Sequence, residues 1–151
     1  MSKKAKTYTL SKSKSTAGHL AQLAVARTVA DLQPGQPIPV HLWGRDHWST
    51  FGYAECRLVD HKGTINNAHM RGNAPGHNAG YPTRLAGGVE LDGHSDYDCL
   101  FDAEAAGLLV LDGTGLHPHI RCLTEKGALV AAALRSHKAD GGSFGNFRFG
   151  G

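Results

Sequence analysis

The stretch that decides the fold is HSDYDCLFDAEAAGLLVLDGTGLHPHIRCLTEKGALVAAALRSHKA, residues 94–139. Ser95 and Asp98 have the spacing of a capping box, in which each side chain satisfies a backbone amide at the start of a helix. Gly107 suits the left-handed position that follows a helix. Apolar residues between these signals recur at helical spacing: Tyr97, Leu100, Phe101, Ala105 and Leu108.

Residues 108–123 read as two apolar strands around the turn sequence Asp112-Gly113-Thr114-Gly115. Thr124 is a good N-cap for a second helix over residues 124–139. One face of that helix is apolar and carries Leu129, Val130, Ala133 and Leu134. The stretch therefore predicts helix, hairpin and helix in that order.

A helix ending in EAAGLL, a hairpin with a Gly-rich tip and an LTEKG helix start resemble the C-terminal half of a winged-helix domain over residues 95–138. The resemblance implies that the first helix reads DNA and that the hairpin is the wing. That helix carries no Lys or Arg, and its acidic residues would repel phosphate: Asp96, Asp98, Asp102 and Glu104. The helix can therefore serve for packing or protein contact instead. The strings WGRDHWSTF and HSDYDCL also resemble small phage- and plasmid-type proteins, which implies no activity.

Before residue 94 the patterns indicate a helix from Ser15 or Thr16 to Pro34, followed by a β-rich half. Strands are expected in IPVHLW (38–43), WSTFGYAECRLVD (48–60) and TINNAHM (64–70), because aromatic and β-branched residues favour extension. YPTRLAGGVEL (81–91) is expected to be a hairpin around Gly87-Gly88, and residues 71–80 a loop. The expected fold class is α+β: an N-terminal helix, a central antiparallel sheet and a winged-helix-like helix–hairpin–helix.

The length of 151 residues fits one domain, with 40% hydrophobic and 19% charged residues. We expect a disordered basic arm at 1–14, a single domain at 15–138, and a flexible Gly/Phe-rich tail at 139–151. No apolar run approaches the roughly 20 residues of a membrane span. Three cysteines without CxxC spacing argue against a disulfide framework and favour a cytoplasmic location: Cys56, Cys99 and Cys122.

The net charge of +3 conceals a split between the two parts of the chain. Residues 1–30 carry six Lys or Arg and no acid, whereas the rest carries 10 Lys or Arg against 13 Asp or Glu. A basic arm of this kind can track phosphates, although it can also be a solvated tail. The candidate nucleic-acid-binding residues are Lys3, Lys4, Lys6, Lys12, Lys14, Arg45, Arg71 and Arg84.

Ten histidines favour metal or proton chemistry, or reflect composition alone. Adjacent Asp46 and His47 would point to opposite faces of a strand, so His47 needs partners from elsewhere, and His69 and His94 are the candidates. These three are the catalytic residues if the protein is an enzyme. The alternative for His47 is a hydrogen-bonded core residue.

A metal site is suggested by His69, His94 and Asp96, since imidazole and carboxylate ligands suit zinc or manganese. The alternatives are helix capping for Asp96 and loop polarity for the histidines. His117 and His119 lie on one face of a strand, which is a second arrangement that metals favour.

The leading hypothesis is a non-enzymatic module that binds nucleic acid or a nucleoprotein complex, with no membrane contact. A second hypothesis is a metal-dependent phosphodiester hydrolase centred on His47, His69, His94 and Asp96. A third is a protein inhibitor or assembly factor whose acidic 92–104 surface contacts a partner protein.

Overall fold

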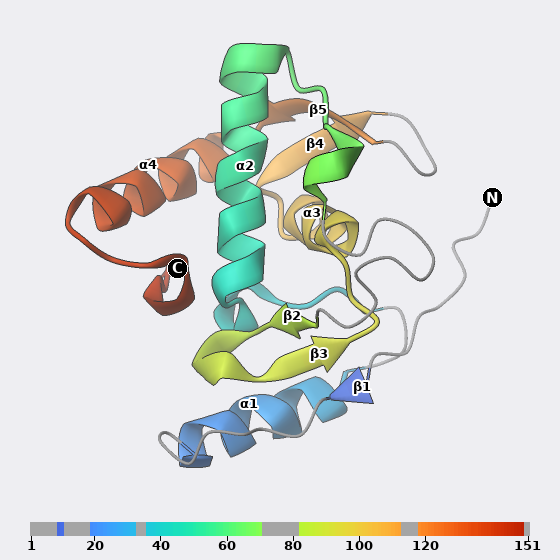
Figure 1. Cartoon of the computed structure of the whole chain (residues 1–151), viewed down its shortest axis with the longest axis vertical. Coiled ribbons are helices and arrows are strands. Elements are labelled where there is room, and N and C mark those ends of the chain that lie inside the picture. Colours follow the sequence, from blue (N-terminus) through green and yellow to red (C-terminus); the bar gives the residue numbers. More distant parts are fainter. Residues whose placement is uncertain (1–8, 11–18, 33–35, 71–81, 113–117, 150–151) are drawn as a thin grey trace.

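Helix α2 (Arg45–His61) runs through the middle of the molecule, with α3 (Asp96–Ala105) on one side and α4 (Glu125–Ala139) on another (Figure 1). The computed structural model describes residues 9–10, 19–32, 36–70, 82–112 and 118–149. Within them it is a mixed helix and sheet fold, as expected. Its two small antiparallel sheets are not central, however, and the centre is helical.

The expected strands at 38–43 and 48–60 are wrong, because residues 40–42 form a short 3-10 turn and residues 45–61 form α2. Trp48, Phe51 and Ala54 recur every three residues, and all three are almost fully buried. This spacing places them on one face of a helix. The apolar area buried on that face outweighs the preference of aromatic and β-branched residues for strands, which is a weak one.

The first sheet contains β1 (Thr9–Leu10), β3 (Glu90–Asp92) and β2 (Thr83–Arg84), in the order β1-β3-β2 and antiparallel throughout. The hairpin expected around Gly87-Gly88 is confirmed. The pairing of β1 corrects the expectation of a disordered arm for those two residues. The expected strand at 64–70 is also wrong, since Asn67–His69 is a 3-10 turn.

The C-terminal half follows the predicted order of α3, β4 (Leu109–Asp112), β5 (His119–Leu123) and α4. The capping box of Ser95 and Asp98 is present, and the Thr124 hydroxyl accepts the Gly127 amide at 2.9 Å. Strands β4 and β5 pair antiparallel, while the expected turn at the hairpin tip lies outside the described residues. The N-terminal helix is likewise confirmed as α1 (His19–Ala30).

The expected flexible tail needs correction over residues 140–149, which pack back against α2 and α4 (Figure 1). The Phe147 side chain is buried, and its ring meets the Trp48 ring edge-on at 4.7 Å between centroids. The His137 Nε2 lies 2.7 Å from the Ser143 carbonyl oxygen, which holds the turn after α4. The phenylalanines of this segment therefore act as core residues.

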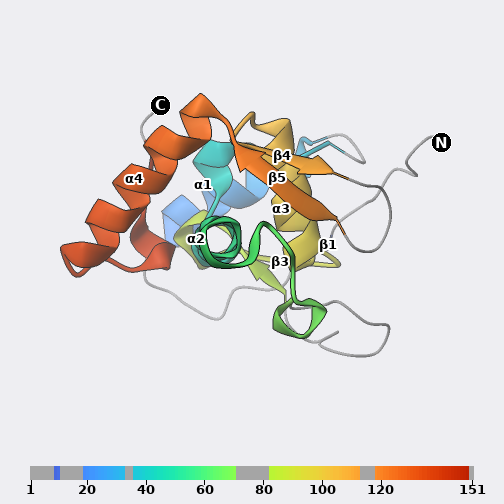
Figure 2. The ribbon, with the colours of Figure 1, turned by 90° about the horizontal axis from the view of Figure 1, so that it is seen from above.

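The view along α2 shows α4 on one side and the β4–β5 hairpin on the other (Figure 2). Apolar side chains from all of these elements form one core around Trp43, Trp48, Phe51, Leu100 and Ile120. No helix among the described residues has both the length and the apolar character that a membrane crossing requires.

Candidate buried polar site

The start of α2 is fixed against strand β2. Trp43 forms a bridge with Leu85, and a Cβ at Gly44 would lie 2.3 Å from the Leu85 carbonyl carbon. Only glycine allows so close an approach of the two backbones. This close approach fixes the first turn of α2 relative to β2. The side chains that follow Gly44 therefore have defined positions.

His47, in that first turn, meets Asp102 of α3 inside the molecule. The His47 Nε2 lies 2.8 Å from Asp102 Oδ2, and His94 Nε2 lies 2.8 Å from the same oxygen. The exposed fractions of His47, His94 and Asp102 are only 1%, 3% and 5%. One carboxylate oxygen thus accepts hydrogen bonds from two imidazoles that are 47 residues apart in the sequence.

Burial raises the pKa of Asp102, but the hydrogen bonds from His47 and His94 outweigh it and leave that pKa below its ordinary value. Burial lowers the pKa of His47 to about 4, an effect that the neighbouring His94 reinforces and the hydrogen bond with Asp102 opposes. At neutral pH the cluster therefore contains an ionised Asp102 and a neutral His47. Because the carboxylate can only accept, the Nε2 of each ring carries the hydrogen.

Two further side chains complete the polar cluster, which we define as His47, Thr83, His94, Cys99 and Asp102. The Thr83 Oγ1 lies 2.9 Å from both the Nδ1 and the carbonyl oxygen of His94, and Cys99 Sγ lies 3.9 Å from that Nδ1. The Nδ1 of His47 is buried and has no hydrogen-bond partner in the described part of the chain. Such an unsatisfied atom costs about 1–3 kcal/mol.

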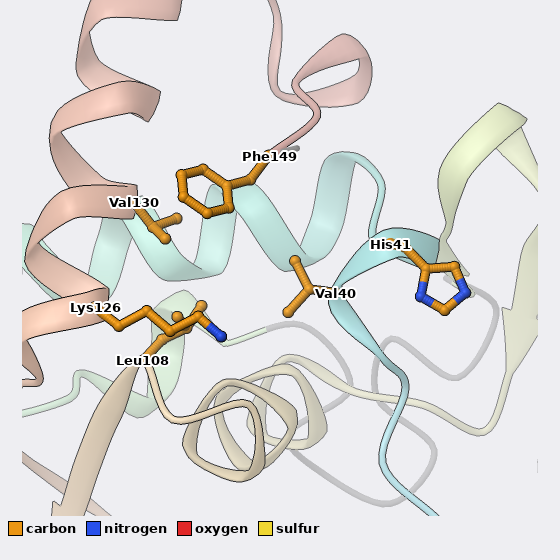
Figure 3. A pocket seen from close by; sticks show the side chains of 6 residues that line it. All are labelled: Val40, His41, Leu108, Lys126, Val130 and Phe149. Atoms are coloured by element: carbon orange, nitrogen blue, oxygen red, sulfur yellow. The ribbon is translucent and has the colours of Figure 1, made fainter. Parts of the chain in front are cut away.

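Apolar side chains close the polar cluster off from solvent. The Trp43 ring stacks on His47, with 4.9 Å between centroids and 17° between planes, and Trp43 itself is fully buried. A pocket of about 240 Å³ elsewhere shares no residue with the cluster (Figure 3). It is lined by Val40, His41, Leu108, Lys126, Val130 and Phe149. The polar cluster is therefore an interior network, out of reach of a substrate in this conformation.

Of the three histidines predicted to act together, the structure joins His47 and His94 but places His69 elsewhere. The His69 Nδ1 lies 2.7 Å from the Tyr53 hydroxyl, and both side chains are part of an exposed contact. Asp96 is the first residue of α3, whose N-cap is Ser95, and it receives a 3.5 Å hydrogen bond from Thr50. Among the described residues, His69 and Asp96 belong to no group of three or more ligands close enough to share a metal.

The predicted nucleic-acid residues Arg45 and Arg84 meet at Asp46. Arg45 Nε donates to Asp46 Oδ1 at 3.1 Å, and the Arg84 backbone amide donates to Asp46 Oδ2 at 2.6 Å. Their side chains are 52% and 49% exposed, and Arg84 also lies 3.6 Å from Glu90. The other predicted nucleic-acid residues lie outside the described residues: Lys3, Lys4, Lys6, Lys12, Lys14 and Arg71. His117, a predicted metal ligand, also lies outside them.

The acidic contact surface expected over residues 92–104 is only partly a surface. Asp98 is 7% exposed and Asp102 5%, because α3 turns both toward the interior. The sequence alone indicates no contact between Asp102 and either histidine, and none for Thr83 or Cys99. The signal that could have found Asp102 is its place three residues after the buried Cys99 on the same helix face, since a buried carboxylate requires donors.

Comparison with protein-family models, curated proteins and solved structures finds no match to this chain. The resemblance of residues 95–138 to a winged-helix domain therefore stays a prediction. Any proposal about function depends on the geometry described above.

Proposed function

We propose that the protein is a non-enzymatic module that binds nucleic acid through the exposed arginines at the start of α2. The observation that carries the proposal is the meeting of Arg45 and Arg84, from distant parts of the sequence, on the single carboxylate of Asp46. Asp46 holds the guanidinium of Arg45 and the backbone amide of Arg84, so the Arg45 side chain loses less freedom when it contacts a phosphate.

Two further features support a phosphate-binding surface here. Arg148 is exposed, its Nη1 donates to the Gly145 carbonyl at 3.1 Å, and Gly145 lies close to the Cβ of Arg45. The first turn of α2 adds the partial positive charge of a helix N-terminus. Asp46 and Glu90 offset part of this charge, so binding at this surface alone is expected to be weak and sensitive to salt.

A binding role is favoured over hydrolysis because the histidines proposed for catalysis do not meet at an accessible place. His47 and His94 are enclosed, while His69 pairs with Tyr53. Helix α3 is a poor candidate for reading DNA, because its exposed and half-exposed positions carry acids and no Lys or Arg. The surface at α2 is therefore the stronger candidate than the recognition helix implied by the winged-helix resemblance.

The test is a series of gel shifts with a short DNA duplex and its single strand across salt concentrations. The double variant Arg45→Ala/Arg84→Ala is expected to bind more weakly and to lower the slope of log affinity against log salt by about 1 per arginine. Each of these arginines takes part in an exposed ion pair, so stability should change by less than about 1 kcal/mol.

Arg121→Ala/Arg135→Ala is the matched control, since these arginines are also exposed and also face a carboxylate, Asp112 and Glu55. It removes the same charge but leaves the start of α2 intact. Equal weakening in both double variants, or no binding by the wild type even at low salt, would contradict the proposal. A selective effect of Arg121, which lies on β5, would instead favour the wing.

A further inference from the structure

Three side chains of the polar cluster, two imidazoles and one thiol, are of the types that bind transition metals. His47, His94 and Cys99 each offer one ligand atom, and these atoms lie within 4.8 Å of one another. In a tetrahedral site, bonds of about 2.0–2.1 Å to nitrogen and 2.3 Å to sulfur place neighbouring ligand atoms about 3.3–3.6 Å apart. The 3.9 Å between His94 Nδ1 and Cys99 Sγ needs to shorten by only a few tenths of an ångström.

The hydrogen bonding of the cluster leaves the appropriate nitrogens for a metal. Asp102 occupies the Nε2 of both rings, which leaves Nδ1 as the nitrogen that each ring can offer to an ion; in His94 this nitrogen lies 3.9 Å from Cys99 Sγ. A carboxylate on the outer nitrogen of a metal-binding histidine is the usual arrangement, because it fixes the tautomer and the orientation of the ring. Thr83 keeps the His94 carbonyl oxygen as its acceptor when His94 Nδ1 binds an ion.

The independent observation that points to a ligand is the Nδ1 of His47. It is buried without a hydrogen-bond partner in the described residues, although almost every buried polar atom in a folded protein has one. Asp102 already holds the other nitrogen of this ring at 2.8 Å, so the ring is positioned while its second nitrogen is unused. A bound ion would satisfy that atom.

We propose that His47, His94 and Cys99 bind one transition-metal ion of the zinc class, with Asp102 as the carboxylate that positions both imidazoles. The mixed nitrogen and sulfur ligands select zinc over magnesium or calcium, which prefer oxygen. Binding converts the Cys99 thiol to a thiolate and releases one proton to solvent for each ion. Three protein ligands leave a fourth coordination position for a water molecule, and enclosure by Trp43 keeps a substrate from that position, so the ion serves to join α2 to α3.

The experiment uses full-length protein without an affinity tag, since a histidine tag would itself bind metal. Metal content per chain is measured by plasma mass spectrometry, and thermal unfolding is followed with and without a chelator. We expect one zinc per chain, and a fall in the unfolding temperature when it is removed. Metal-free protein that takes up no zinc, with an unfolding temperature that the chelator does not change, would overturn the proposal.

Variants then assign the ligands. Cys99→Ala should bind no ion, whereas Cys122→Ala and His69→Gln, at exposed positions, should still bind one. Asp102→Asn should bind the ion about 10–100-fold more weakly, as expected of a positioning residue. Full zinc content in Cys99→Ala would refute this ligand set.

Cobalt substitution keeps the proposal testable if Cys99→Ala does not fold. In a Cys56→Ala/Cys122→Ala variant, Cys99 is the remaining cysteine of the chain. A thiolate-to-cobalt charge-transfer band in this variant must then come from Cys99. Its absence in a cobalt-loaded, folded protein would also overturn the proposal. Neither outcome bears on nucleic-acid binding, which depends on other residues.

Discussion

Asp46 and His47 are neighbours in the first turn of α2, yet they build two different polar sites. Asp46 turns toward β2 and holds Arg45 and the Arg84 backbone at an exposed edge. His47 turns toward α3 and is enclosed with Asp102 and His94. Successive residues on a helix point about 100° apart, so one turn can serve both the surface and the interior.

The two sites differ in what they can contribute. The exposed arginines lie where a large partner can reach them, but their ion pairs in water add little to stability. The polar cluster is inaccessible to a substrate, but its charge and hydrogen bonds lie in a medium of low dielectric, where breaking them is costly. We therefore expect changes at the arginines to affect binding, and changes in the polar cluster to affect stability.

The largest effect on stability is expected from Asp102→Ala. This change leaves two buried imidazole N–H groups without their acceptor, and breaking a buried, charged network of this kind costs about 3–5 kcal/mol. Urea unfolding of chelator-treated protein measures it. Asp60→Ala, the same substitution at an exposed position of α2, is the control and should cost well under about 1 kcal/mol. Similar losses in both variants would show that the network does not stabilise the fold.

A loss of stability in acid is the next largest effect, and it follows from His47. Its pKa is about 4 in the folded protein against 6.5 ordinarily, because of burial first and the nearby His94 second. Between these values the unfolded chain binds a proton that the folded chain does not. Stability should therefore fall as the pH drops from about 6.5 to 4, by about 3 kcal/mol in all for this group.

Chelator-treated protein is required for this measurement, because a bound metal would compete with the proton. Urea unfolding at several pH values gives the profile, and the histidine resonances in NMR give the midpoint for His47 directly. His47→Gln should flatten the profile across this interval. Asp102, whose pKa is also lowered, adds a loss at still lower pH. A His47 midpoint near 6.5 in folded protein would contradict the prediction.

The sequence predicts the C-terminal half well because its signals are local. Ser95 with Asp98, Thr124 and Gly107 each act on backbone groups within a few residues, so their roles hold wherever the segment is placed. Helix α2 was mistaken for strand because Trp48, Phe51 and Val59 favour extension locally. The helical spacing of its apolar residues favours a helix over a strand only when the rest of the fold supplies a core in which that face is buried.

The same distinction applies to the polar cluster. His47 and His94 could be singled out from the sequence as chemically suitable residues. Asp102 could not be assigned as their partner, because that contact exists only when α2 crosses α3. Strand geometry predicts that Asp46 and His47 do not pair with each other. They do not pair in the helix either, but for a different reason: the two side chains face different neighbours.

The smallest expected change in stability, at Asp46, separates the two sites most clearly. Asp46→Ala removes the acceptor of the Arg84 backbone amide and should cost about 1–2 kcal/mol. Asp46→Asn keeps an oxygen for that amide and should cost less. It also removes a negative charge beside Arg45, so nucleic-acid affinity should rise while zinc content stays at one ion per chain. For these two variants, urea unfolding measures the loss of stability, gel shifts measure nucleic-acid affinity, and metal analysis measures zinc content. If Asp46→Asn weakens binding, the start of α2 does not contact phosphate, and if it loses zinc, the two sites are not independent.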